Sequence, residues 1–546
     1  MFNVSAQAPT TVGIGFADGE LDFEPRSLTT GQAVVVTARY ESGQPLAATV
    51  MGVLPPGDAV LSAELPYGSK LTAQDITAAA VVCIDDEVVD LSQLLSDPQE
   101  IVYSTPSMVE AVYRKWVFSV RVTFQVRRYS DGTQWVRVRI DRPDKNRVWS
   151  EDKFGLPVSL DVSIGGKTVY APEDGIALFK NGSISVESYI GDNPYPHEIV
   201  HDTEHWQSTG LLPRMGWVSG VSDGRLDGLY QTYKPGDMGD LNPTMANAGV
   251  TFELGPITGW SARWLASGGD PRAHRAIIAN ALASGAYPIA WADDDGFVLS
   301  PSGSPDIGYN GSNGNGTNTL TNGIAQFDGA HNTELAGVAY LITGDSYFRD
   351  LMLGNLAAIY MMAQSKYGAG NQKVMRGQIR EIGWLILRLG FAVTVMPDDY
   401  PTKSDLREWL WTQYREAIYH GPDSVPDSSF GVPWVYGISS ADEPIQQRPW
   451  MHNFWAAAVA AVARSDALRG TRKEDGQMLA RWMLQSIVGQ LEGCPDHGAE
   501  YNLQYSDQMQ EVQFKRWSAK DLYRSWSECR QANFPGYQCK GKLLPN

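Results

Sequence analysis

The chain is poor in cysteine, and this shortage excludes a disulfide scaffold. Its four cysteines are too few to staple 546 residues, and Cys83 is far along the chain from Cys494, Cys529 and Cys539. Their spacing matches no common metal site. We expect reduced thiols, with a bridge among the last three as the alternative outside a reducing compartment.

Cationic residues and long apolar runs are also scarce. The chain has 44 Lys and Arg against 62 Asp and Glu, a formal net charge of −18, which disfavours nucleic acid as a partner. The best apolar runs, Ala78–Ile84 and Ala456–Ala463, are shorter than the ~18 residues of a membrane helix. The start, Met1 to Gln7, lacks the basic and apolar parts of a secretory signal. We therefore expect neither membrane insertion nor an exported precursor.

Aromatic residues and glycine are abundant. The 17 Trp and 24 Tyr offer flat apolar faces, and the 54 Gly permit tight loops. Surfaces of this kind suit sugar rings. The alternative for any single Trp is that a large core buries it.

Residues 1–195 show the period-two alternation of antiparallel strands. The clearest hairpin is predicted from Trp116–Val126, a turn at Tyr129–Gly132, and a return at Trp135–Ile140. Its alternation predicts one exposed polar face. Shorter runs of the same kind occur at Ala33–Arg39, Val158–Ile164 and Ile184–Tyr189. The pattern predicts a β sandwich or barrel, of one or two subdomains.

Residues 251–493 change to the 3.6-residue period of helices. Helices are predicted at Thr258–Ala266, Pro271–Ser284, Glu334–Ile342, Tyr347–Gln364, Val374–Thr394, Lys403–Tyr419, Phe454–Arg464 and Gln477–Leu491. Helical hairpins with short links stack into a solenoid or close into a ring, and their irregular spacing favours an α/α toroid. The expected fold is therefore α+β, with a connecting segment at 196–250 and a C-terminal extension at 494–546.

Three blocks in the helical part resemble known sequences. Gly329–Phe348, Arg376–Trp384 and Pro397–Pro401 are similar to blocks of bacterial and bacteriophage proteins with an α/α-toroid domain. A β part followed by a toroid resembles the RIFT-barrel proteins related to exo-rhamnogalacturonan lyases. The resemblance implies a carbohydrate-active protein that binds a bacterial surface polysaccharide, with cleavage by a lyase or hydrolase mechanism left open.

The absence of a visible export signal suggests where such a protein would meet a polysaccharide. A phage tail particle, released by lysis, reaches a surface glycan without secretion, whereas a cytoplasmic enzyme is the other possibility. The alternative function is a non-catalytic tail or baseplate protein that binds host glycan or other tail subunits. A homo-oligomer is expected in either case, and no cofactor is.

His331, Asn332 and Glu334 form the most distinctive polar set. If a helix begins just after Asp328, His331 and Glu334 lie one turn apart on one face and combine a base with a carboxylate, beside Asn332 as a sugar ligand. The alternative is that Asp328 and Glu334 only cap the helix.

Arg376, Arg380 and Trp384 fall on one face of a predicted helix. Two guanidinium groups beside an aromatic ring are suited to a uronate carboxylate and its sugar. In a lyase they would neutralise that carboxylate while His331 or a tyrosine removes a proton. A solvated arginine face is the alternative.

Acidic pairs and a second aromatic group complete the candidates. Asp294, within Asp293–Asp295, could act with the pair at Asp398–Asp399 as acid and base of a hydrolase, although Asp-rich turns usually cap helices. Tyr436, Trp450 and His452 are predicted to stack on sugar. The alternative there is the start of a core-lining helix.

His197, His201 and His205 recur every four residues. His197-Glu-Ile-Val-His201 matches the zincin string, and on a helix its two histidines would grip a divalent metal. No apolar helix surrounds the string, so an interdomain or surface segment is the preferred interpretation.

Overall fold

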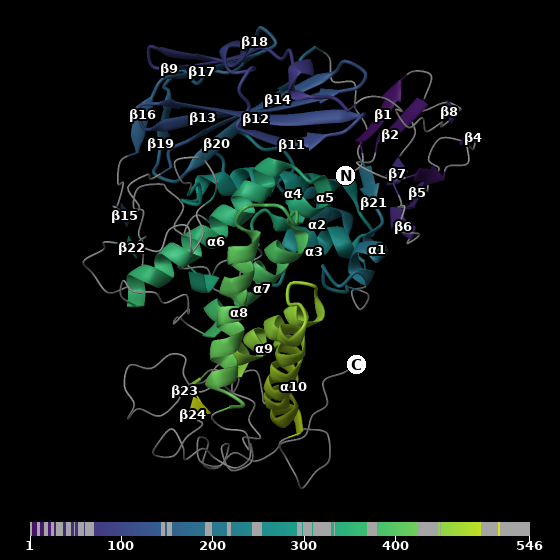
Figure 1. Cartoon of the computed structure of the whole chain (residues 1–546), viewed down its shortest axis with the longest axis vertical. Coiled ribbons are helices and arrows are strands. Elements are labelled where there is room, and N and C mark those ends of the chain that lie inside the picture. The colour runs from purple at the N-terminus through teal and green to yellow at the C-terminus, as the bar shows by residue number, and fades with distance from the viewer. Residues whose placement is uncertain are drawn as a thin grey trace.

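The computed structural model describes most of the chain from residue 70 to 488 (Figure 1). Side chains are described for residues 70–143, 155–191, 201–215, 220–242, 254–291, 334–360, 379–423 and 451–488, and for 298, 329 and 331. Outside these ranges only the backbones of individual strands, helix ends and one 3-10 turn are described. The described part is a set of antiparallel sheets followed by a helical region, which confirms the α+β class.

Two antiparallel sheets lie face to face in the β part. The five-stranded sheet runs in the order β11 (Glu100–Ser104), β12 (Met108–Val117), β13 (Val120–Tyr129), β14 (Gln134–Asp141) and β20 (Ser183–Tyr189). The four-stranded sheet runs β10 (Glu87–Asp90), β9 (Ala80–Ile84), β17 (Leu160–Ile164) and β18 (Lys167–Tyr170). Val82 and Phe124, one from each sheet, share a core. None of the sheets built from the described strands closes into a barrel.

The remaining strands form small sheets. In the first 69 residues the strands are β1 (Asn3–Gln7), β2 (Thr11–Gly15), β3 (Glu20–Asp22), β4 (Ser27–Leu28), β5 (Val36–Arg39), β6 (Pro45–Ala48), β7 (Val50–Gly52) and β8 (Ala59–Val60). β7 pairs with β21 (Ile199–His201). The other short strands are β15 (Val148–Trp149), β16 (Leu156–Val158), β19 (Ile176–Leu178), β22 (Gly308–Tyr309), β23 (Gln446–Gln447) and β24 (Val512–Gln513). Four 3-10 turns are described, namely η1 (Ala73–Asp75), η2 (Leu91–Gln93), η4 (Ser284–Ala286) and η5 (Gly329–His331).

The predicted hairpin is present with one correction. The run Trp116–Val126 was expected to be a single strand, but β12 ends at Val117 and β13 begins at Val120. Phe118 occupies the turn with a φ of 52°. The alternation continues across this turn, which is why periodicity alone does not reveal it. The second turn, at Tyr129–Gly132, lies where predicted, with Gly132 at a φ of 101°.

All eight predicted helices are present, with shifted ends. They are α3 (Gly259–Ala266), α4 (Pro271–Ala283), α5 (Gly337–Thr343), α6 (Ser346–Tyr367), α7 (Ile379–Val395), α8 (Lys403–Tyr419), α9 (Pro449–Arg464) and α10 (Thr471–Glu492). Two short helices precede them, α1 (Thr203–Ser208) and α2 (Asp223–Asp227). Leu212, Leu226 and Leu241 pack into the same core as the later helices. The segment expected to be a connection therefore contributes to the helical region.

The helices stack as hairpins in two layers. Odd-numbered helices contact one another, as α5 with α7 and α7 with α9, and even-numbered helices do likewise, as α4 with α6 and α8 with α10. In Figure 1 the stack leads from α3 and α4, beneath the sheets, to α9 and α10 at the far end. Two layers of this kind are common to solenoids and rings.

The polar face of the five-stranded sheet is not exposed, contrary to the prediction. Arg121, Gln125 and Arg137 are at most 4% exposed because the face packs against the start of α6. Arg137 Nη1 lies 2.7 Å from Asp345 Oδ2, and Gln125 Nε2 donates to Asp345 Oδ1 over 2.8 Å. Alternation distinguishes apolar from polar residues, but it does not say what covers the polar ones.

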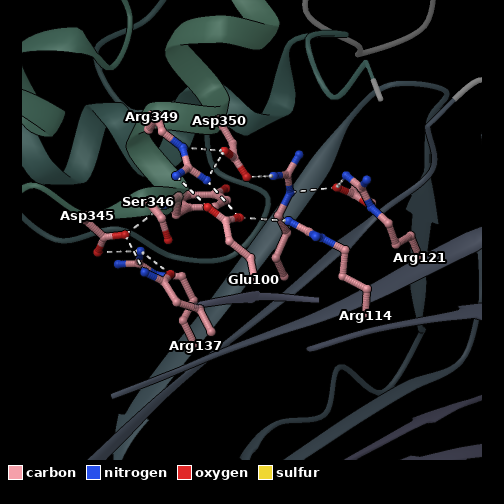
Figure 2. Close-up of polar contacts among 12 residues, drawn as sticks. Glu100, Arg114, Arg121, Arg137, Asp345, Ser346, Arg349 and Asp350 are labelled. Atoms are coloured by element: carbon pink, nitrogen blue, oxygen red, sulfur yellow. Dashed lines mark hydrogen bonds and ion pairs between the residues drawn. The ribbon is translucent and has the colours of Figure 1, made fainter. Parts of the chain in front are cut away.

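Further pairs extend this contact along the start of α6 (Figure 2). Ser346 Oγ donates to Glu110 over 2.7 Å, and Arg349 Nη1 lies 2.7 Å from Glu100. We call Glu100, Glu110, Gln125, Arg127, Arg137, Asp345, Ser346 and Arg349 the ionic layer. Because the buried charges pair across it, the ionic layer holds the sheet and the helices in one arrangement.

Candidate functional site

His331 and Arg380 come together at the start of α7. Arg380 lies in the first turn of that helix, and its Nη2 is 3.0 Å from Nε2 of His331 in η5. A guanidinium only donates, so Nε2 accepts, and the neutral imidazole then carries its proton on Nδ1. The predicted pairing of a base with a cation is therefore present in the geometry.

Glu381 lies beside this pair and was not predicted. It is 4% exposed, and its carboxylate lies so close to Gly329 that a Cβ at that position would collide with it. Gly329 is thus needed for η5 to rest on the first turn of α7. The available signal was that Glu381 is the one carboxylate in a largely apolar helix, where a buried charge requires a partner.

The starts of α7 and α9 lie at the same end of the helical region. Gly383 meets Trp455, and Gly390, seven residues later, meets Val462, seven residues after Trp455. Equal steps along both helices mean that they run parallel. His452 lies three residues before Trp455, and Arg380 lies three residues before Gly383. The same register therefore places His452 level with Arg380.

Two aromatic predictions change in this light. Trp384 is 5% exposed, and its ring centroid lies 5.1 Å from that of Phe454 on α9. His452 is fully buried, with its ring edge-on to Trp455. Neither ring is open to a sugar, and both side chains pack in the contact between α7 and α9. For His452 this is the core-lining alternative that was stated for the start of α9.

Glu334 is a correction to the predicted helix. The helix that begins after Asp328 is only the 3-10 turn η5, which ends at His331, and in the described residues the next α-helix, α5, begins at Gly337. Glu334 is buried and accepts the backbone N–H of Gly337 as a cap. Burial raises the pKa of its carboxyl, while Arg388 and the backbone donors oppose the rise. The cap replaces the predicted His331–Glu334 helical pair.

Five of the predicted site residues lie outside the described side chains. These are Asp294, Asn332, Arg376, Tyr436 and Trp450, although the backbone of Trp450 is in α9. Of the second acidic pair, Asp398 is exposed and bonded to Lys403 Nζ over 2.8 Å, which lowers its pKa. It behaves as a surface ion pair.

The histidine string is not helical in its described part. His201 ends the strand β21, and a new helix, α1, begins at Thr203 with Asp202 as its N-cap. His201 stacks on His274 at a centroid distance of 5.6 Å, and burial lowers its pKa to about 3. The described part of the string therefore does not form the helix that the metal alternative would require, and His197 lies outside the described residues. Within the described part of the chain no group of three or more His, Cys, Asp or Glu is placed to hold a metal.

No helix in the described part is long and apolar enough to cross a membrane. No protein-family model, curated protein or solved structure matches the chain. The site must therefore be interpreted from its own chemistry.

Proposed function

We propose that the protein binds an acidic, uronate-containing polysaccharide at the end formed by η5, α7 and α9, and cleaves it by β-elimination. The observation that carries the proposal is the contact of Arg380 with Nε2 of His331. It supplies the two groups that elimination requires, a fixed cation and an imidazole that accepts a proton.

Each residue has a stated role in this reaction. Arg380 exchanges its bond to His331 for the substrate carboxylate, whose neutralisation acidifies the neighbouring C5–H. His331 Nε2 then removes that proton, the electron pair forms the C4–C5 double bond, and the glycosidic oxygen leaves C4 and is protonated by solvent. The products are an unsaturated uronate and a new chain end.

The described carboxylates support hydrolysis less well. Glu334 is committed to capping α5, and Asp398 pairs with Lys403 at the surface. A hydrolase needs two carboxyl groups facing one sugar linkage. The lyase route uses the groups that the fold brings into contact.

The wider architecture belongs to the same proposal. We propose that the two helical layers belong to an α/α toroid, that the N-terminal sheets form a barrel-like module, and that the protein works on a phage tail as a homo-oligomer. The irregular spacing of the helical hairpins favours the toroid over a solenoid, and the alternating contacts of odd and even helices are compatible with it. A non-catalytic tail protein that only binds glycan is the alternative.

The test is elimination activity on alginate, polygalacturonate and bacterial capsule glycans. Ultraviolet absorbance of the unsaturated product should appear with the wild-type protein. His331→Gln should lower the rate by about 100-fold or more, because the general base is lost. Arg380→Gln should have an effect of similar size, because the cation that stabilises the developing charge is lost. Arg481→Gln changes an exposed cation on α10 and should leave the rate unchanged.

Two results would decide against elimination. New reducing ends without absorbance would indicate hydrolysis. Binding without any turnover would favour the non-catalytic tail protein.

A further inference from the structure

The turn between β12 and β13 carries an aromatic side chain in a strained conformation. Phe118 is 79% exposed and has a φ of 52°. This left-handed region suits glycine and is unfavourable for a bulky residue. A two-residue hairpin turn normally places Gly, Asn or Asp at such a position.

The strands below the turn hold it rigidly. Val117 and Val120 are paired in register and are 7% and 1% exposed. Directly after Val120, Arg121 is bonded through two nitrogens to the buried carboxylate of Asp141, at 2.9 and 2.7 Å. Because the strand ends below the turn are fixed, the Phe118 side chain faces solvent and does not pack into a core.

The surroundings of Phe118 indicate the kind of partner. Ser119, the other residue of the turn, is exposed, and so is Lys115, three residues before Phe118 in β12. At about 3.3 Å per residue, Lys115 lies roughly 10 Å from Phe118 along the strand. One aromatic face with polar neighbours is too small for a protein interface, which typically buries about 800 Å² on each side. An exposed surface of this size suits one pyranose ring stacked on Phe118, with Lys115 in reach of a carboxylate on the next sugar.

We infer that the β12–β13 turn is a second glycan-binding site, at which Phe118 stacks on a sugar ring and Lys115 binds a uronate carboxylate. The site lies in the β part, apart from His331 and Arg380. The choice of an acidic glycan rests on the proposed function. The backbone strain at Phe118 is then the cost of presenting an aromatic ring where glycine would be more stable.

The experiment measures affinity and stability of the same variants. Binding of alginate and polygalacturonate is measured by calorimetry, and melting is followed by circular dichroism. Phe118→Gly should weaken polymer binding about tenfold or more. The same variant should melt about 2–4 °C higher, because glycine relieves the strain. Phe118→Trp should keep the affinity, and Lys115→Gln should weaken it for these acidic polymers.

Matched controls separate this site from general surface effects. Val88→Ser removes another exposed apolar side chain, 62% exposed on β10, and Lys167→Gln removes an exposed cation on β18. Both should bind like the wild type. The inference is overturned if Phe118→Gly binds normally, if Val88→Ser weakens binding equally, or if the wild type binds neither polymer.

Two further readouts distinguish this inference from the proposed function. If the variant Phe118→Gly changes the sedimenting mass, the turn is a contact between copies of the chain and the inference fails. Turnover of a short uronate oligosaccharide should be unchanged in the same variant. Phe118-dependent binding without any turnover would retain this site and remove the lyase.

Discussion

At the scale of single residues, Asp345 joins the sheet to the start of α6. Its carboxylate meets Arg127 and Arg137 from the sheet, at 3.1 and 2.7 Å, and accepts a bond from Gln125. The arginine side chains also lie over the ring of Trp135. These groups are buried, so their charges are compensated by one another and not by water.

Replacing this carboxylate should be costly. Asp345→Asn leaves two buried guanidinium groups short of a counter-charge, and we expect a loss of about 3–5 kcal/mol in the free energy of unfolding. Urea unfolding at neutral pH measures the loss. Asp466→Asn, which breaks the exposed pair with Lys473, is the control and should have little effect. Equal loss in both variants would argue against the ionic layer.

The same residue predicts a dependence on pH. Arg137 and Arg127 lower the pKa of Asp345 against the effect of burial, so its folded pKa lies below the unfolded value of about 3.9. Its stabilisation is complete above about pH 4 and is lost as the pH falls below that value. Stability of the wild type should therefore decline in acid more steeply than that of Asp345→Asn. Parallel pH curves would contradict the assignment.

Among the candidate site residues, sequence reasoning identified some partners and missed others. His331 and Arg380 were both selected, and the fold places them in contact across 49 positions of the chain. Their meeting could not be derived from spacing, because it depends on how η5 rests on α7. Glu381 was missed for the same reason. Glu334 caps α5, which was the alternative stated for it, and a cap and a catalytic carboxylate look alike in sequence.

At the scale of elements, the hydrophobic period was sufficient to predict the helices but not the turns between strands. The eight helices were found because each buries an apolar stripe that repeats every 3.6 residues. The break at Phe118 was missed because no glycine or asparagine marks it. The helix that a metal site at His197 and His201 would need is not formed in the described part of that segment, and a period of four residues fits a strand as well, where alternate residues share a face.

The α7–α9 contact gives a prediction at this scale. A Cβ on Gly383 would lie 3.0 Å from the Cα of Trp455, so Gly383→Ala should force the helices apart and cost about 1–3 kcal/mol. Thermal unfolding measures the cost. Gly224→Ala in α2 meets open space and should be neutral or stabilising, since alanine favours helix. A neutral result at Gly383 would contradict the parallel packing.

At the scale of the whole molecule, the β-rich and helical parts are joined through charge. The division into two parts was predictable, because the hydrophobic period changes along the chain. The join was not predictable, because the ionic layer pairs residues more than 200 positions apart, as Arg137 with Asp345. The ionic layer therefore joins the two parts, so that the two proposed glycan sites would be held at fixed positions.

The central claim is that Arg380 recognises the carboxylate of an acidic glycan. The most direct measurement is calorimetric binding of a short uronate oligosaccharide and of the same oligosaccharide with its carboxyl groups reduced to alcohols. The wild type should bind the acidic form about tenfold more tightly or better. In Arg380→Gln, compared in a Lys115→Gln background so that the second proposed site does not contribute, that preference should disappear. Equal binding of both forms by the wild type, or an unchanged preference in Arg380→Gln, would contradict this role of Arg380.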